Sequence, residues 1–235
     1  MTRVPLRGLT WDHPRAWQGL EAESVRLAGE APELAVDWGR HSLRRFEEAA
    51  LAEIAAAHDL VIFDHPFVGD AAASGAVLDL VPHAAELGLA ELEADALGLS
   101  LASYRYRGGL WALPIDGACQ TAAYRPDLVA GAPLPSNFEE AVALGRRSGL
   151  ILALAVPHAF MNHLSICGLL GAAFDGEGPL LVDADQSAEA IEIQRRLVAF
   201  CPEAARGWSS IGALDALARS GGPGYCPLVF AFVTY

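Results

Sequence analysis

The first third of the sequence alternates short apolar runs with helical patterns, and this constrains the fold more than any other feature. Residues 6–11, 34–38 and 59–63 form apolar runs of strand length, the last continuous, as in a parallel strand covered on both faces. Residues 14–27 and 42–54 place apolar side chains at helical spacing between them. This β-α-β-α-β order predicts an α/β fold with a parallel sheet and right-handed crossovers.

The second half of the sequence resumes this alternation. Gly108-Gly109 is typical of a hairpin turn, and Ser136-Asn137-Phe138-Glu139 predicts a capping box that opens a helix. Residues 151–156 and 228–233 are predicted as buried strands, with helices over 159–173 and 186–200. Because no covering helix follows the strand at 228–233, we expect the sequence to end before its fold is complete.

Composition excludes several classes of function. All sixteen basic residues are arginine, so neither a P-loop lysine nor a Schiff-base lysine exists. A net charge of −13 argues against nucleic-acid binding, which needs concentrated positive charge. The four cysteines lie far apart in apolar surroundings, which favours buried free thiols. The first ten residues contain no apolar h-region, so the sequence as written predicts no cleaved leader.

The tripeptide Asp-His-Pro occurs twice, at Asp12-His13-Pro14 and at Asp64-His65-Pro66. Each follows a predicted parallel strand, and ligands of open α/β sheets bind beyond the carboxyl ends of strands. If the first and third strands are neighbours, both pairs and Trp11 face one crevice. The alternative is that each aspartate caps the following turn while proline sets its φ angle. We interpret His13, His65 and Trp11 as ligand contacts, because a turn does not need them.

Other chemistry is less well supported by the sequence. A metal site built from His13, His65, Asp12 and Asp64 is possible, but no known zinc spacing is present. No G-x-S-x-G elbow occurs, so a nucleophilic enzyme is not favoured. Of His158 and His163, we expect one to be a core residue and one to face a ligand. Aromatic side chains near predicted strand ends offer flat faces to a sugar or another organic ligand: Trp11, Trp38, Phe67, Tyr124, Trp208 and Tyr225.

Two longer stretches resemble a known family. The first is Tyr106-Arg-Gly-Gly-Leu-Trp-Ala-Leu-Pro-Ile-Asp116, and the second is Ala122-Ala-Tyr-Arg-Pro-Asp-Leu128. Both are similar to a pattern in the family-one, sugar-type extracellular solute-binding proteins of ABC importers. In that pattern a hairpin reaches a Leu-Pro step into a second lobe, and a tyrosine–basic–x–Asp-Leu signature follows. The family's Pro-x-Thr-Trp-x-Glu helix start is similar to Leu134-Pro-Ser-Asn-Phe-Glu-Glu-Ala141. Asn137 and Phe138 depart from the family's pattern.

The resemblance implies a two-lobed type-two periplasmic-binding-protein-like fold with mostly parallel sheets, incomplete at the C-terminus. Residues 1–114 would form the first lobe, without its return segment, and residues 115–235 an incomplete second lobe. A small polar solute, a sugar or a carboxylate, would be held in the interlobe cleft. The implied contacts are Asp64, His65 and Phe67 in the first lobe, Asp116 and Tyr124 at the crossing, and Trp208 and Tyr225 in the second lobe; His158 is our further candidate there.

The same resemblance implies partners and a compartment. The chain would be a monomeric receptor without a cofactor, not an enzyme, and would deliver its solute to ABC permease subunits. The family is periplasmic or extracellular, whereas the missing leader leaves a cytoplasmic location open. Two alternatives therefore remain: a metal-assisted hydrolase that uses His13, His65 and Asp64, and a cytosolic ligand sensor on the same fold.

Overall fold

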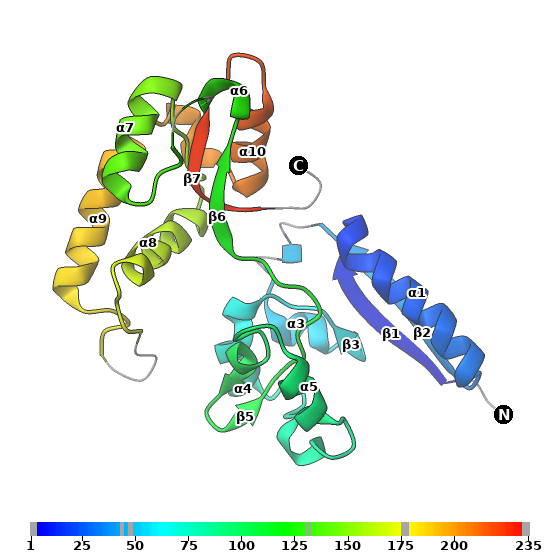
Figure 1. Ribbon diagram of the computed structural model, residues 1–235. Helices are drawn as coiled ribbons and strands as arrows, with labels where there is room; N and C mark the ends of the chain where they lie inside the picture. The colour runs from blue at the N-terminus through cyan, green and yellow to red at the C-terminus, as the bar shows by residue number, and fades with distance from the viewer. Residues whose placement is uncertain are drawn as a thin grey trace. The chain divides into compact units, whose positions relative to one another are not determined.

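The computed structural model describes residues 4–42, 45–46, 49–129, 131, 133–174 and 179–231. The chain divides into two compact units, residues 1–117 and 118–235 (Figure 1). The boundary lies three residues beyond the expected end of the first lobe at residue 114.

The first unit is built on a three-stranded parallel sheet. Strands β1 (Val4–Trp11), β2 (Leu34–His41) and β3 (Leu60–Val61) pair in the order β2-β1-β3. All eight residues of β1 align with β2, and Gly8 and Leu9 align with β3. The parallel sheet predicted from the alternating pattern is therefore confirmed, and so is the neighbouring position of the first and third strands.

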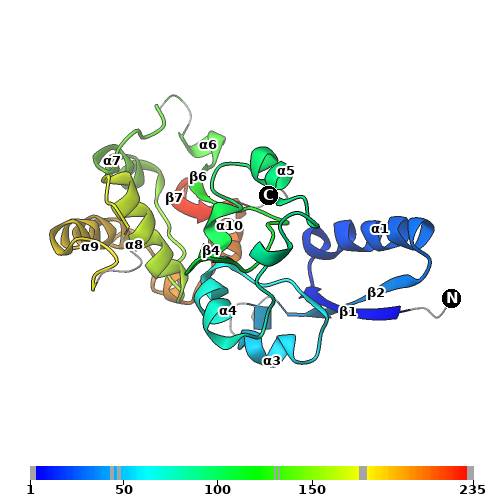
Figure 2. The same ribbon diagram turned by 90° about the horizontal axis from the view of Figure 1, so that it is seen from below.

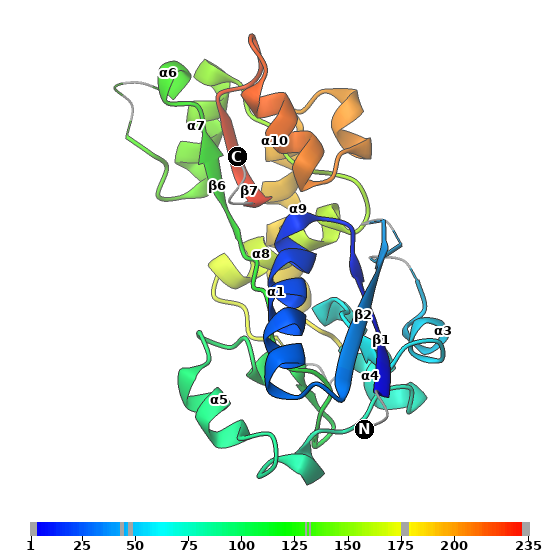
Figure 3. The ribbon, with the colours of Figure 1, turned by 90° about the vertical axis from the view of Figure 1, so that its right-hand side faces the viewer.

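Helix α1 (Pro14–Glu30) connects β1 to β2 and lies along them (Figure 3). Trp38 of β2 donates from its indole Nε1 to the hydroxyl of Ser24 at 3.0 Å, which ties the strand to the helix. The Trp38 ring also covers Gly8, where an added Cβ would lie 2.4 Å from it. Glycine at this position lets the indole pack directly against the β1 backbone.

Short helices make up most of the remaining first unit. Of the helix predicted over residues 42–54, the structure describes helical residues 45–46 and a short α3, and the Ser42 hydroxyl accepts from the Arg45 N–H; Leu43 lies outside the described residues. Helix α5 begins only after Gly88, which adopts a left-handed conformation (φ 61°). The elements are α3 (Leu51–Ala55), η1 (His65–Phe67), α4 (Val68–Ser74), η2 (Val81–His83), α5 (Leu89–Asp95) and η3 (Ala102–Tyr104).

The predicted hairpin is present at the end of the first unit. Strands β4 (Arg105–Tyr106) and β5 (Gly109–Leu110) pair antiparallel. The two connecting residues, Arg107 and Gly108, have φ angles of 50° and 82°. Positive φ at both central residues is typical of a type I′ turn, which is why glycine is favoured in it.

The second unit packs helices on a pair of strands, β6 (Gln120–Tyr124) and β7 (Tyr225–Phe230) (Figure 2). Side chains of β7 enter two core clusters: Tyr225 and Leu228 pack with α7, α8 and α9, whereas Cys226 and Val229 pack with α10. Helices therefore cover both faces of this strand pair. They are α6 (Pro126–Val129), α7 (Phe138–Ser148), α8 (His158–Leu169), α9 (Ala184–Val198), η4 (Glu203–Gly207) and α10 (Ser210–Ala218).

Three expectations for the second unit need correction. Strands β6 and β7 are antiparallel, so mostly parallel pairing holds only in the first unit. Residues 151–156 form no strand: Ile151 is buried and donates its N–H to Tyr225, but only Leu150 makes a bridge. The final strand begins at Tyr225 instead of Leu228, and residues 232–233 lie outside the described residues.

The capping box at the start of α7 is present one position later than predicted. Asn137 is the N-cap, and its side-chain oxygen accepts from the Glu140 N–H at 2.9 Å. The Glu140 carboxylate accepts in return from the Ser136 N–H at 2.8 Å. No helix in the described part of the chain combines the length and apolar character needed to cross a membrane.

Candidate functional site

The two Asp-His-Pro tripeptides follow neighbouring strands of the first-unit sheet. Asp12 comes directly after β1, and Asp64 comes three residues after β3 ends at Val61. Because β1 and β3 are adjacent and parallel, both tripeptides lie at the carboxyl edge of the sheet. This part of the sequence prediction is confirmed.

The first tripeptide uses its histidine as a cap. His13 is the N-cap of α1, and its Nδ1 accepts from the Arg15 N–H at 3.2 Å. The expectation that the turn does not need this histidine is therefore wrong. Asp12 is exposed, and its Oδ1 lies 3.9 Å from Nη1 of Arg40.

The second tripeptide leaves its histidine exposed. Asp64 is the N-cap of η1, and its Oδ1 accepts from the His65 N–H at 2.9 Å. The His65 Nε2 lies 3.1 Å from the carbonyl oxygen of Ser103, so this nitrogen carries the proton. The imidazole meets the Tyr104 ring edge-on, with centroids 5.9 Å apart. Phe67 is half-buried at the end of η1.

Two residues that sequence reasoning missed complete this group. Arg15 Nε lies 3.2 Å from the Asp116 carboxylate, and its guanidinium carbon lies 5.8 Å from the Trp11 ring centroid. Burial raises the pKa of Tyr104, and the nearby charges of Asp64 and Asp116 raise it further. Both carboxylates therefore act on the same phenol. We call Arg15, Asp64, His65, Tyr104 and Asp116 the first-unit cluster.

The first-unit cluster combines charged and neutral hydrogen-bonding groups. Its two carboxylates accept hydrogen bonds, its guanidinium donates, and its phenol can do both. Tyr104 and His65 also present ring surfaces, which suit the apolar faces of a sugar or a similar solute. The arrangement is typical of a binding surface for a small molecule that carries several hydroxyl or amino groups.

A second polar group lies in the second unit, at the start of α8. His158 is buried, with 8% of its surface exposed. Its Nδ1 lies 3.4 Å from the Ser210 hydroxyl, and its ring packs against Phe230 at a centroid distance of 6.3 Å. The same hydroxyl accepts from the Phe230 N–H at 3.3 Å.

One turn along α8, Asn162 is fully buried and fully engaged. Its Nδ2 donates to the carbonyl of Ala153 at 2.8 Å, and its Oδ1 accepts from Gln120 at 2.7 Å. The Gln120 side-chain oxygen accepts in turn from the Ser165 hydroxyl at 2.6 Å. We call Gln120, His158, Asn162, Ser165 and Ser210 the second-unit cluster, which sequence reasoning missed apart from His158.

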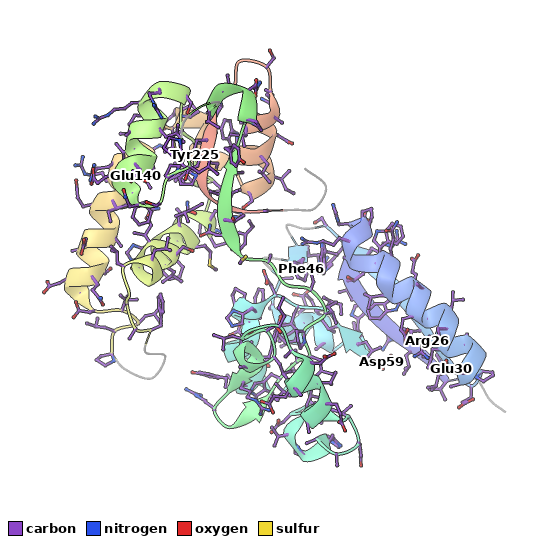
Figure 4. All side chains as sticks on the ribbon, in the orientation of Figure 1. Arg26, Glu30, Phe46, Asp59, Glu140 and Tyr225 are labelled. Atoms are coloured by element: carbon purple, nitrogen blue, oxygen red, sulfur yellow. The ribbon has the colours of Figure 1, made fainter. Side chains whose placement is uncertain are left out.

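The aromatic candidates divide into core and surface residues. Trp11 is 5% exposed and packs on Phe46 at 4.8 Å, near the carboxyl ends of β1 and β2 (Figure 4). Tyr225 is 4% exposed and belongs to the second-unit core. The expectation that these two rings face a ligand is therefore wrong for this structure. Tyr124 is 42% exposed, and Trp208 is half-buried against α10.

The structure also bears on the predicted metal site and on the predicted buried thiols. Within the described ranges, no group of three or more His, Cys, Asp or Glu side chains is placed to hold a metal ion. The metal-site alternative thus has no ligand cluster in that part of the chain. His163 contacts the Ser187 hydroxyl at 3.1 Å. All four cysteines are free, but Cys119 is exposed, against expectation.

The buried His158 makes stability depend on pH. Burial lowers the pKa of its imidazole from 6.5, so the unfolded chain binds this proton more readily than the folded chain. We therefore expect the free energy of unfolding to fall as pH drops below 6.5. Urea unfolding of the chain and its His158→Gln variant at several pH values measures this. The variant should lose less stability on acidification; equal losses would contradict the assignment, and His83→Gln, at a half-buried position, serves as the control.

Comparison with known proteins identifies the fold. No protein-family model and no curated protein matches the sequence. Among solved structures, a solute-binding protein of an ABC transporter from Agrobacterium radiobacter, in complex with ribitol, has a TM-score of 0.70 at 20% identity. The maltose-bound MalE3 of T. maritima has a TM-score of 0.68 at 16% identity, and the GacH receptor of Streptomyces glaucescens 0.68 at 17%.

These matches cover nearly all of this chain but not all of the matched proteins. The ribitol-complexed protein is matched over 97% of this chain and 61% of its own length; the corresponding shares are 96% and 61% for MalE3 and 96% and 60% for GacH. The chain therefore has the fold of ABC transporter solute-binding proteins and spans about three fifths of their length. The predicted two-lobed periplasmic-binding-protein-like fold is confirmed.

Proposed function

We propose that the chain binds a small polar organic solute, a sugar, polyol or carboxylate, as the substrate-binding component of an ABC importer. The observation that carries this proposal is the first-unit cluster, which gathers two carboxylates, a guanidinium, a phenol and an imidazole near one edge of the sheet. These groups are typical of sites that recognise ligands rich in hydroxyl groups.

The fold supports the same function. The matched proteins are described as a solute-binding protein in complex with ribitol, a maltose-bound protein and a receptor in complex with acarbose. Polyols and sugars need both donors and acceptors, and the first-unit cluster offers both. A binding role, not catalysis, explains this combination best.

The remaining candidate contacts fit this proposal to different degrees. Phe67, Tyr124 and Trp208 keep exposed or half-buried rings that could pack on a ligand. His13 is already used as a helix cap, so its Nδ1 is occupied by the Arg15 N–H. The proposal includes ABC permease subunits as partners, a monomeric state and a periplasmic or extracellular location. A cytosolic ligand sensor is the alternative.

A thermal-shift screen of the chain tests the proposed ligand class. The panel contains neutral sugars, sugar alcohols and small carboxylates, because a ligand that binds only the folded state raises the melting temperature. We expect at least one member of these classes to raise it in a concentration-dependent way. If none does at millimolar concentration, the proposed function is wrong.

A further inference from the structure

A separate cavity lies in the first unit, between the sheet and α3. Its volume is about 470 Å³, within the range of small-molecule sites. Leu9 of β1, His41 of β2 and Ile54 of α3 form three of its sides. No residue of the first-unit cluster lines it. The complete lining is Leu9, Arg40, His41, Arg45, Glu53, Ile54, Ala57 and His58.

The imidazole of His41 is the unusual feature of this cavity. Both of its ring nitrogens are shielded from solvent, and neither has a hydrogen-bond partner among the described residues. Its ring also has an apolar contact: Phe46 meets it edge-on, with centroids 6.0 Å apart. A buried polar group without a partner is costly, and native structures rarely leave one. A bound group that hydrogen-bonds to His41 would remove this cost.

The charges around His41 favour an anionic partner. Burial lowers the pKa of His41, and the nearby Arg45 and His58 lower it further. Arg45 lies 3.6 Å from Glu53, which is too long for a direct hydrogen bond and leaves the guanidinium without a bidentate partner there. His58 binds the carbonyl of Ile54 through Nδ1 at 2.8 Å, so its Nε2 is the nitrogen left to meet a ligand.

Arg40, which also lines the cavity, is held from the opposite side. Arg40 forms ion pairs with Glu21 and Asp12, and its guanidinium stacks on Trp17 at 3.8 Å from the ring centroid. The Arg40 guanidinium is therefore already paired with side chains of α1 and of the turn after β1. His41, Arg45 and His58 are left as the polar groups that could bind an anion.

Apart from Glu53, which pairs with Arg45, the rest of the cavity is apolar. Leu9 is 9% exposed, Ile54 is 7% exposed, and Ala57 lies beside them. A fully hydrated inorganic ion would gain nothing from this surface, whereas a ligand with an apolar body would bury area against it. We propose that this cavity binds a small carboxylic acid whose carboxylate contacts His41 and Arg45 and whose apolar body packs on Leu9, Ile54 and Ala57.

The proposal has a consequence for pH. A carboxylate beside His41 stabilises the imidazolium form, so binding takes up a proton. Affinity should therefore rise as the pH falls from about 7.5 to about 5.5, a range over which a carboxylate of ordinary acidity stays ionised.

Benzoate is a suitable probe, and the uncharged benzamide is its control. The histidine ring proton resonances of the chain are followed by NMR during titration with each compound. Benzoate should shift the His41 and His58 resonances saturably, and binding should weaken by about tenfold or more for benzamide, since it lacks the charge. His41→Leu should lose the benzoate effect, and His83→Gln, at a half-buried position outside the cavity, should keep it.

The outcomes separate this proposal from its alternatives. Saturable shifts that are stronger at low pH and absent in His41→Leu support it; if that variant does not fold, His58→Gln takes its place and should weaken binding. Shifts that stay linear in benzoate concentration, or that are equal for benzamide, overturn it. Failure here leaves the proposed solute binding at the first-unit cluster unaffected, because no residue is shared.

Discussion

Replacing Leu197 with alanine is expected to lower the free energy of unfolding of the chain by about 2–5 kcal/mol. Leu197 lies on α9 and has no exposed surface in the larger core cluster of the second unit. Removing its isobutyl group loses apolar burial and leaves a cavity that the surrounding helices fill only in part. Urea unfolding followed by circular dichroism measures the loss.

The matched control is on the same helix. Ile191 is 57% exposed, so Ile191→Ala should change the free energy of unfolding by about 0.5 kcal/mol or less. Similar losses for the two variants would contradict the packing of α9 against the core. A loss of stability in Ile191→Ala but not in Leu197→Ala would mean that the Ile191 face of α9 packs against the core.

Asn162→Leu is expected to have the second large effect, although leucine is of similar volume. The change leaves the carbonyl of Ala153 and the side-chain nitrogen of Gln120 without their partner. Each buried polar group left unpaired costs about 1–3 kcal/mol. The free energy of unfolding should fall accordingly in the same urea experiment.

Ser165→Ala is the control for Asn162→Leu. It removes a single hydrogen bond, to a half-buried Gln120 oxygen, so its cost should be about 0.5–1.5 kcal/mol. If Asn162→Leu is neutral or stabilising, the polar chain through the second-unit cluster is not formed in solution.

The parallel sheet of the first unit could be predicted from the sequence, because its strands are separated by helical patterns of the length that a crossover needs. The strand predicted at residues 151–156 could not. Ile151 is as buried as a strand residue, but burial produces the same apolar run whether or not the backbone pairs with a neighbour. The late start of α5 depends on the backbone conformation of Gly88, which a glycine permits without requiring.

The candidate site was predicted only where it depends on sheet topology. The two Asp-His-Pro tripeptides lie at one edge of the sheet because β1 and β3 are adjacent. Asn162 was missed, since its partner Gln120 is 42 residues away and no local pattern marks the pair. Trp11 and Tyr225 were overinterpreted, because an aromatic residue near a strand end serves a core as readily as a ligand.

Calorimetric titration shows whether residues around Asp64 and His65 hold a small polar solute. The titrant is the compound that stabilises the chain most in the thermal-shift screen. His65 is exposed and His83 half-buried, with 40% of its side chain exposed, and both lie in short 3₁₀ helices that contain a proline, which makes their alanine variants a matched pair. We predict that His65→Ala weakens binding by about tenfold, as expected for the loss of one good polar contact, and that His83→Ala binds like the unchanged chain. Equal affinities for all three proteins would contradict binding by these residues.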